Sequence, residues 1–438
     1  MPTFRAPPTA PTLRFAHALA RRELLPWILL GVTLGLVEGA TAAVLLKQHF
    51  GVAGGGAVNF AVSIVSGAPA MANVLSFAWA NLGSGRARVP LLAALQLLFA
   101  LLVGLIGFVP RIAGGLLFTV LSILAARMVW AGILTLRSSV WIANFPRNTL
   151  ARMTGRVVVG SSLTVATTSG LVAIALQSGT IDTRLLYAAA AFSGIAAAFL
   201  YRQTRMRREY RVLKAEQQSG TAQNAFSLRV FRQILRDDKA FRHYMFWMGV
   251  YGAGNVMMTS QLVVIMTDHL RLPGQQQILI LSVIPLLIQP IFVPFWARIF
   301  DRQHTVTFRA RQGWCMVGGF LLSCTGVLSG WTGFLWGGSI LLGAAMAGAN
   351  FGWNLGHQDF AAPGQVQQYM GVHVTLTGLR GMVAPPLGML FYQLLETAQR
   401  GAGRYSILLP TLVTLTGALG FNHLRKQYYL SRKQSPST

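Results

Sequence analysis

Three charged side chains lie inside long apolar runs of this sequence, namely Glu38, Arg127 and Arg380. Placing a charge near the centre of a bilayer costs at least about 2.5 kcal/mol on insertion scales. Such residues therefore usually face a cavity or an opposite charge. Glu38 could carry a proton or bind a cationic ligand, and Arg127 could take part in the same chemistry. Arg380 could bind an anionic group, because a guanidinium matches the geometry of carboxylate and phosphate.

The same residues also have purely structural interpretations. Glu38 and Arg127 could form a permanent ion pair, and Arg127 could also extend its charged end toward a membrane surface. The sequence assigns no acidic partner to Arg380. Glu38 shares a helical face with Gly31 and Gly35, and small residues there allow close helix packing or leave room for a ligand. In either case we expect these charges to face the protein interior.

Several polar or aromatic side chains in the other apolar runs are candidates for lining a cavity. Asn255 occupies the position in the second half of the chain that corresponds to Glu38 in the first. We therefore group it with the substrate-binding or proton-coupling candidates Glu38, Arg127 and Arg380. The further cavity candidates are Gln289, Thr164, Thr167 and Trp130.

No motif in the sequence indicates an enzyme. There is no G-x-x-x-x-G-K-[S/T] phosphate-binding loop, so ATP-driven activity by this chain alone is not expected. The trio His357, Gln358 and Asp359 lacks the spacing of a metal site. We therefore expect no catalytic residues, no metal and no cofactor.

The apolar runs are long enough to cross a membrane. Of the 438 residues, 53% are hydrophobic and only 11% are charged, whereas soluble proteins average about 25% charged residues. Runs of about 20 apolar residues recur along the chain, as membrane-spanning helices require. The sequence therefore predicts an all-α integral membrane protein with twelve transmembrane helices, at residues 24–46, 57–80, 89–109, 112–136, 157–178, 184–201, 243–265, 278–297, 310–330, 332–355, 369–395 and 404–424.

The distribution of Lys and Arg predicts the orientation of these helices. With the N-terminus inside, 29 of the 37 Lys and Arg residues lie in inside segments, 6 lie outside and two lie within spans. This bias places both termini in the cytoplasm. Most of the net charge of +26 then reflects topology and attraction to anionic lipid, so nucleic acid is not an expected partner.

The twelve predicted helices fall into two groups of six. The segment between them is polar, strongly basic and free of long apolar runs, which is typical of a cytoplasmic loop. We therefore divide the chain into an N-terminal cytoplasmic tail (1–23), an N-terminal six-helix bundle (24–201), a basic cytoplasmic linker (202–242), a C-terminal six-helix bundle (243–424) and a C-terminal cytoplasmic tail (425–438).

An internal repeat relates the two bundles. When the sequence is shifted by 217 residues, Trp79 falls on Trp296, and Glu38 falls on Asn255. Both tryptophans lie at the predicted cytoplasmic end of the second helix of their group. We interpret the repeat as two pseudo-symmetric bundles related by parallel duplication.

Six plus six spans, a basic central loop and basic turns after the second and eighth spans resemble the Major Facilitator Superfamily. That family has a loop signature near G-x-L-x-D-R-x-G-R-R. The loop after the second span keeps Arg86 and Arg88 but lacks the acidic residue, whereas the loop after the eighth span keeps it as Asp301, followed by Arg302. The resemblance implies that these loops are cytoplasmic gates and that two halves rock around a midplane cavity by alternating access.

The resemblance also extends to function. An acidic residue in the first span and an arginine in the fourth, here Glu38 and Arg127, are similar to the pattern of proton-coupled exporters. We therefore predict a secondary active transporter that moves a small organic solute, coupled to protons, with export preferred over uptake. It would act as a monomer in a bacterial inner membrane. The alternatives are an uptake permease for an organic anion and a transporter-like membrane scaffold that uses the basic linker as its partner surface.

Overall fold

The computed structural model describes residues 10–110, 112–145, 147–179, 182–207, 209–219, 228–362 and 365–434. The described residues form helices and connecting turns, without a β-strand among them. The first half consists of α1 (Ala10–Val37), α2 (Gly39–Met71), η1 (Ala72–Leu75), α3 (Ser76–Gly83), α4 (Arg88–Ile106), α5 (Ala113–Asn144), α6 (Arg147–Ser178) and α7 (Thr183–Tyr201). This composition confirms the predicted all-α fold.

The linker and the second half follow the same helical pattern. Two helices lie between the halves, α8 (Glu209–Ser219) and α9 (Leu228–Asp237). The second half consists of α10 (Lys239–Asp268), α11 (Gly274–Ile278), the π-helical turn η3 (Leu279–Val283), α12 (Ile284–Phe300), α13 (Thr305–Ser329), α14 (Gly333–Asn354), η4 (Gly356–Asp359), α15 (Val366–Ala398), η5 (Ala402–Ile407) and α16 (Leu408–Gln434).

Among the described residues, ten or eleven stretches are long and apolar enough to cross a membrane, and α13 is long enough to be a twelfth. Ten stretches qualify by length and hydropathy, and the pair α1 and α2, bent by 45° at their junction, adds an eleventh. The twelfth is α13, whose 25 residues extend about 37 Å at 1.5 Å per residue. That length exceeds the roughly 30 Å hydrocarbon core of a bilayer. The early turns of α13 carry Arg309 and Arg311, which lower its hydropathy.

The first two crossings differ in detail from the predicted spans. A bend at Glu38 interrupts the first predicted span, and α2 continues from there as far as Met71. Within α2 the backbone breaks at Gly55, where φ is +43° and ψ is −126°. Glycine tolerates a positive φ because it has no Cβ. The first crossing therefore ends in the early part of α2, and the second begins after Gly55 and continues through η1 and α3.

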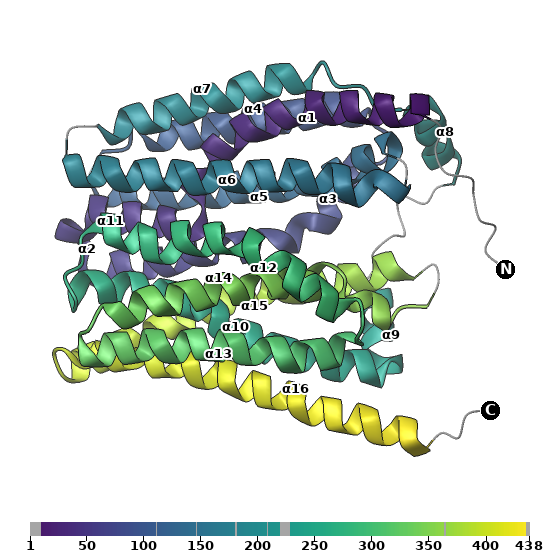
Figure 1. The fold of residues 1–438 in the computed structure, drawn as a ribbon. Coiled ribbons are helices and arrows are strands. Elements are labelled where there is room, and N and C mark those ends of the chain that lie inside the picture. The colour runs from purple at the N-terminus through teal and green to yellow at the C-terminus, as the bar shows by residue number, and fades with distance from the viewer. Residues whose placement is uncertain are drawn as a thin grey trace.

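The two halves lie side by side (Figure 1). In this view the first half lies above the second, and the start of α1 and the end of α16 lie at the same side, near α8 and α9. An even number of crossings requires this arrangement. We call the side that holds the start of α1 and the end of α16 the proximal end and the opposite side the distal end.

Helix packing repeats between the halves. In the first half α1 packs against α6 and α7, and in the second half α10 packs against α15 and α16. A Cβ at Gly31 would lie 3.1 Å from the Cβ of Thr164. The matching residues in the repeat are Met248, at the shift of 217, and Arg380, at a shift of 216 that allows a one-residue slip in this helix. Arg380 Nη1 donates to the Met248 carbonyl at 3.0 Å. Equivalent helix pairs therefore meet at equivalent positions, as the internal repeat predicts.

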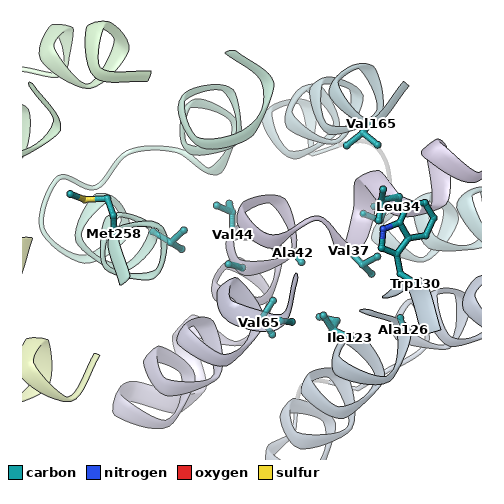
Figure 2. Packing of buried hydrophobic residues seen from close by; sticks show 14 of the residues in the cluster. Leu34, Val37, Ala42, Val44, Val65, Ile123, Ala126, Trp130, Val165 and Met258 are labelled. Carbon is teal, nitrogen blue, oxygen red and sulfur yellow. The ribbon is translucent and has the colours of Figure 1, made fainter. Parts of the chain in front are cut away.

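Apolar side chains face both the core and the outer surface. Figure 2 shows Leu34 and Val37 of α1 beside Trp130 and Ala126 of α5, within the packed interior of the first half. On the outside, large apolar side chains such as Phe192 of α7 are largely exposed. In a multi-pass membrane protein such surfaces face lipid, where exposure carries no hydrophobic penalty.

Candidate functional site

Glu38 lies at the junction of α1 and α2. Its backbone is extended, with φ −69° and ψ 134°, and its carbonyl accepts the N–H of Ala42 at 2.8 Å to begin α2. The carboxylate does not cap this helix. The Glu38 carboxylate therefore makes no hydrogen bond to the start of α2 and can instead contact a neighbouring helix.

The partner of Glu38 is Arg127 of α5. Arg127 Nη1 donates to Glu38 Oε2 at 3.0 Å. The Arg127 side chain is 8% exposed, whereas the Glu38 side chain is 31% exposed. The pair is thus asymmetric, with a buried cation and a carboxylate that still meets open space. The structure brings these two predicted site residues together.

A cavity of about 260 Å³ lies against this pair, between the two halves. Glu38 lines it from the first half, and Asn255 of α10 and Gln289 of α12 line it from the second. Hydroxyl groups and apolar side chains complete its wall, among them Ser66, Thr259, Ser282, Leu262, Met258 and Phe320. Arg127 does not line the cavity, so a ligand there would meet the ion pair from its carboxylate side.

Polar contacts join the halves between this cavity and the distal end. Thr41 Oγ1 lies 3.0 Å from Ser169 Oγ and 2.9 Å from Ser282 Oγ, so it links α2 to α6 and to η3. Further along α2, Lys47 Nζ lies 2.9 Å from Asp268 Oδ2, near the end of α10. Lys47 also donates to Asn59 Oδ1 at 2.6 Å. These contacts close the cavity from the distal side.

Arg380 lies apart from the cavity, along α10 in the proximal direction. Its guanidinium rests over Gly252, where an added Cβ would lie 1.9 Å from Nη1. Only glycine at position 252 leaves room for this side chain. Arg380 hydrogen-bonds the carbonyl of Met248, and it is not among the cavity-lining residues.

The other predicted cavity residues have different locations. Trp130 is buried in the core of the first half, with its ring 5.3 Å from that of Phe99 (Figure 2). The Thr164 hydroxyl donates to the carbonyl of Gly160 in its own helix at 2.9 Å. Thr167 of the same helix is exposed. None of the three lines the cavity at Glu38.

The two predicted gate loops lie at the proximal end. In the first loop the Arg88 guanidinium donates to the carbonyl of Arg86 at 3.0 Å, and the Arg88 backbone N–H donates to Glu209 Oε1 of α8 at 3.1 Å. In the second loop Asp301 and Arg302 are exposed after the end of α12. The first loop lacks the acidic residue of the family signature, and a carboxylate from the linker binds there.

A buried polar cluster at the proximal end of the first half was not predicted. Trp141 Nε1 donates to Glu23 Oε2, and Glu23 is fully buried. The Arg137 guanidinium lies 4.4 Å from the ring centroid of Trp27 and 4.0 Å from that of Trp141. Tryptophan rings attract cations through their quadrupole. Arg137 directly follows the predicted fourth span (112–136), and the tryptophans nearby were the available signal for its burial.

The described residues contain no group of three or more His, Cys, Asp and Glu side chains that could hold a metal ion. At the cavity, the Glu38–Arg127 pair and the amide and hydroxyl groups around it are the polar groups that could act on a ligand.

Two helical halves around a shared polar cavity define a multi-pass membrane transporter fold. Residues 27–385 match the family model of the Major Facilitator Superfamily, and the chain belongs to this family. The resemblance in the loop sequences is thereby confirmed at the level of the family.

Solved structures of transporters share this fold. The nucleoside transporter NupG superposes with a TM-score of 0.70 at 11% identity, covering 93% of this chain and 99% of that one. A D-xylose-proton symporter gives 0.66 at 12% identity, covering 93% and 97%. A bacterial homolog of the human lysosomal transporter Spinster, inward-facing and occupied, gives 0.63 at 12% identity, covering 98% and 100%. No curated protein sequence matches the chain.

Proposed function

We propose that the protein is a proton-coupled secondary transporter for a small, neutral or cationic organic solute, with export preferred over uptake. The observation that carries this proposal is the position of Glu38. Its carboxylate pairs with Arg127 at 3.0 Å and at the same time lines the cavity between the halves. Three species can therefore compete for one carboxylate, namely the arginine, a proton and a bound solute.

This competition links solute binding to proton binding. When Glu38 is ionised, Arg127 neutralises it and the cavity presents a partly satisfied carboxylate. When Glu38 takes up a proton, the pair weakens and Arg127 is left as a buried cation, which is costly in a membrane interior. A solute that donates a hydrogen bond or a positive charge to Glu38 favours the ionised form. Solute binding then expels the proton.

The cavity wall supports a solute that is small and only partly polar. Asn255 and Gln289 each offer an amide that can both donate and accept hydrogen bonds. Leu262, Met258 and Phe320 offer apolar contact. The nucleoside and xylose transporters with the same fold carry solutes rich in hydrogen-bonding groups, and at 11–12% identity they indicate the fold alone.

The proposed orientation places the proximal end in the cytoplasm. The dense Lys and Arg content of the linker supports this choice. The contacts of Thr41 and Lys47 then lie on the external side of the cavity, and α2 and η1 pack against α15 toward its cytoplasmic side. Alternating access would require the contacts on one side to break as those on the other side form.

The test is proton release on solute addition, measured at a series of pH values from acidic to neutral in weakly buffered detergent solution with a library of cationic, neutral and anionic solutes. At pH values where Glu38 carries a proton, wild-type protein should release protons with a cationic or neutral solute, and Glu38→Gln should bind without release. The matched control is Glu23→Gln, because Glu23 is a buried carboxylate of the first half that lies at the proximal end and does not line the cavity. That variant should release protons like wild type.

Two results would argue against proton coupling at Glu38. The first is solute binding with equal proton release in wild type and Glu38→Gln. The second is solute binding without proton release in wild-type protein at any pH of the series. Binding of anionic solutes alone, lost in Arg380→Gln, would instead favour the organic-anion permease.

A further inference from the structure

Two arginines in the second half have no acidic partner among the described residues, in contrast to Arg127 and Lys47. Arg309 of α13 is 1% exposed, its Nη1 donates to Gln312 Oε1 and its Nη2 to the carbonyl of Ala349, and the Tyr244 hydroxyl lies within its reach. Arg380 donates to the carbonyl of Met248. Among the described residues, neither arginine forms a salt bridge with an acidic side chain.

The first half handles its buried cations differently. Arg127 pairs with Glu38, and Lys47, from the same half, pairs with Asp268. Arg137 lies close enough to Glu23 for electrostatic interaction. A buried charge is normally paired or bound to a ligand, since isolated burial costs several kcal/mol. Arg309, which is buried, and Arg380, which is half-buried with a buried Nε, therefore require an explanation.

Unpartnered hydrogen-bonding atoms surround these two arginines. His373 of α15 is fully buried and neither ring nitrogen has a partner. One turn further along the helix the Thr377 hydroxyl is also buried and unpartnered, and so are the Nε atoms of Arg309 and Arg380. Residues 373, 377 and 380 are spaced by four and three positions, so they share one face of α15. His373 is within electrostatic range of both arginines.

His357 of η4 borders the same cluster. Its ring centroid lies 6.4 Å from that of His373, and its Nδ1 is buried without a partner. Burial lowers the pKa of the His357 imidazole, so its ring is neutral near pH 7. The positive charge of the cluster therefore comes from the arginines, while a neutral imidazole can supply an N–H donor.

The remaining polar neighbours do not supply a negative charge. The Tyr244 hydroxyl donates to the carbonyl of Gly352 at 3.4 Å. Asp359 Oδ2 accepts the backbone N–H of Thr305 at 2.7 Å, and Asp359 is exposed. Gln312 donates to the carbonyl of Ala345 at 2.9 Å. The cluster thus combines two positively charged guanidinium groups with unpartnered N–H and O–H donors. Among the described residues, no carboxylate forms a salt bridge with either guanidinium.

We propose that a small monovalent anion, either chloride or the carboxylate of a small acid, binds between Arg309, His373 and Arg380. Arginine and imidazole N–H groups are suitable donors for both ligands. The site is separate from the cavity at Glu38, because Met248 precedes the cavity residue Asn255 by seven positions, about 10 Å along α10. The proposal does not depend on proton coupling. The backbone packs tightly against Arg309, because a Cβ at Gly352 would lie 2.3 Å from Arg309 Nε. We therefore expect a small ligand.

The test uses the full chain in detergent, in buffer whose only anion is a bulky sulfonate. Titration with chloride or formate at constant ionic strength should raise the unfolding midpoint Tm saturably, by roughly 2–4 °C. Equilibrium dialysis with radioactive chloride should show stoichiometric binding that formate displaces. A response to formate without chloride binding would identify the carboxylate as the ligand, and a response to chloride alone would identify the inorganic anion.

Variants locate the response. Arg380→Gln and His373→Gln should each lose the saturable rise in Tm and the bound anion. Arg311→Gln is the matched control, because Arg311 lies on the same helix as Arg309 but is exposed, and it should respond like wild type. If either Arg380→Gln or His373→Gln fails to fold, the other variant and the dialysis of wild-type protein still test whether an anion binds at this cluster. No saturable response in wild type, or an equal response in all variants, would overturn the proposal.

Discussion

Removing the two members of the Glu38–Arg127 pair should have unequal effects on stability. Glu38→Gln leaves Arg127 buried at 8% exposure with no carboxylate, and an arginine cannot neutralise itself by losing a proton. Arg127→Gln leaves a carboxylate that is 31% exposed to the cavity and can take up a proton. We therefore expect Glu38→Gln to be the more destabilising change.

The structure bounds the magnitude of this effect. At 3.0 Å two unit charges attract by about 5.5 kcal/mol at an effective dielectric constant of about 20. Desolvation offsets much of that attraction, and breaking a buried pair by removing one partner costs about 3–5 kcal/mol. Because Glu38 is partly exposed to the cavity, we expect a value at or just below the lower end of this range. We expect a loss of about 2–3 kcal/mol for Glu38→Gln and about 1 kcal/mol for Arg127→Gln.

The assay is a double-mutant cycle on thermal unfolding in detergent. With roughly 2–4 °C per kcal/mol for a unit of about half this chain, Glu38→Gln should lower Tm by roughly 5–10 °C. The double variant should be more stable than Glu38→Gln alone, because it removes the unpaired cation. A double variant that loses the sum of both single effects, or an Arg127→Gln loss larger than that of Glu38→Gln, would refute this reasoning.

Three further predictions concern contacts outside the cavity. Glu209→Gln should weaken the bond to the Arg88 backbone by about 1 kcal/mol and increase proteolysis of the linker, and unchanged cleavage would contradict it. Asp268→Asn should leave Lys47 unpaired and favour opening at the distal end, seen as faster thiol labelling of a cysteine introduced there, whereas unchanged labelling would show that the pair does not hold this end closed. Gly35→Leu should cost about 1–3 kcal/mol by overpacking, since even a Cβ would lie 2.8 Å from a side chain of α6, and an unchanged Tm would contradict that packing.

The positions of the helices were largely predictable from composition. Apolar runs of bilayer length must form helices, because lipid offers no partners for backbone hydrogen bonds. The bend at Glu38 was not predictable, since neither proline nor glycine occupies position 38. Its cause lies in tertiary contacts, because the pair with Arg127 and the hydroxyl contacts of Thr41 hold the two helix segments at an angle.

The site was predictable only where a charge interrupted an apolar run. That rule found Glu38 and Arg127, and the repeat then led to Asn255, which lines the cavity with Glu38. The rule is less informative for uncharged residues. Trp130 and Thr164 lie on membrane helices like the cavity residues, but which helix face meets the cavity depends on the packing of both halves. Glu23 lay at the predicted boundary of the first span, where a charge can reach water and costs little free energy. The rule therefore did not select Glu23.

The repeat relates the backbones of the two halves but not their charges. The contact between Gly31 and Thr164 in the first half is neutral, and its counterpart in the second half is a guanidinium over the carbonyl of Met248. The first half also pairs a carboxylate that lines the cavity with a buried arginine behind it, whereas Arg380 in the second half has no acidic partner among the described residues. A parallel duplication gives both halves the same helix pairings, so their different chemistry arises from side chains at a few equivalent positions. The proposed proton site and the proposed anion site then lie in different halves, and movement of one half against the other would change the distance between them.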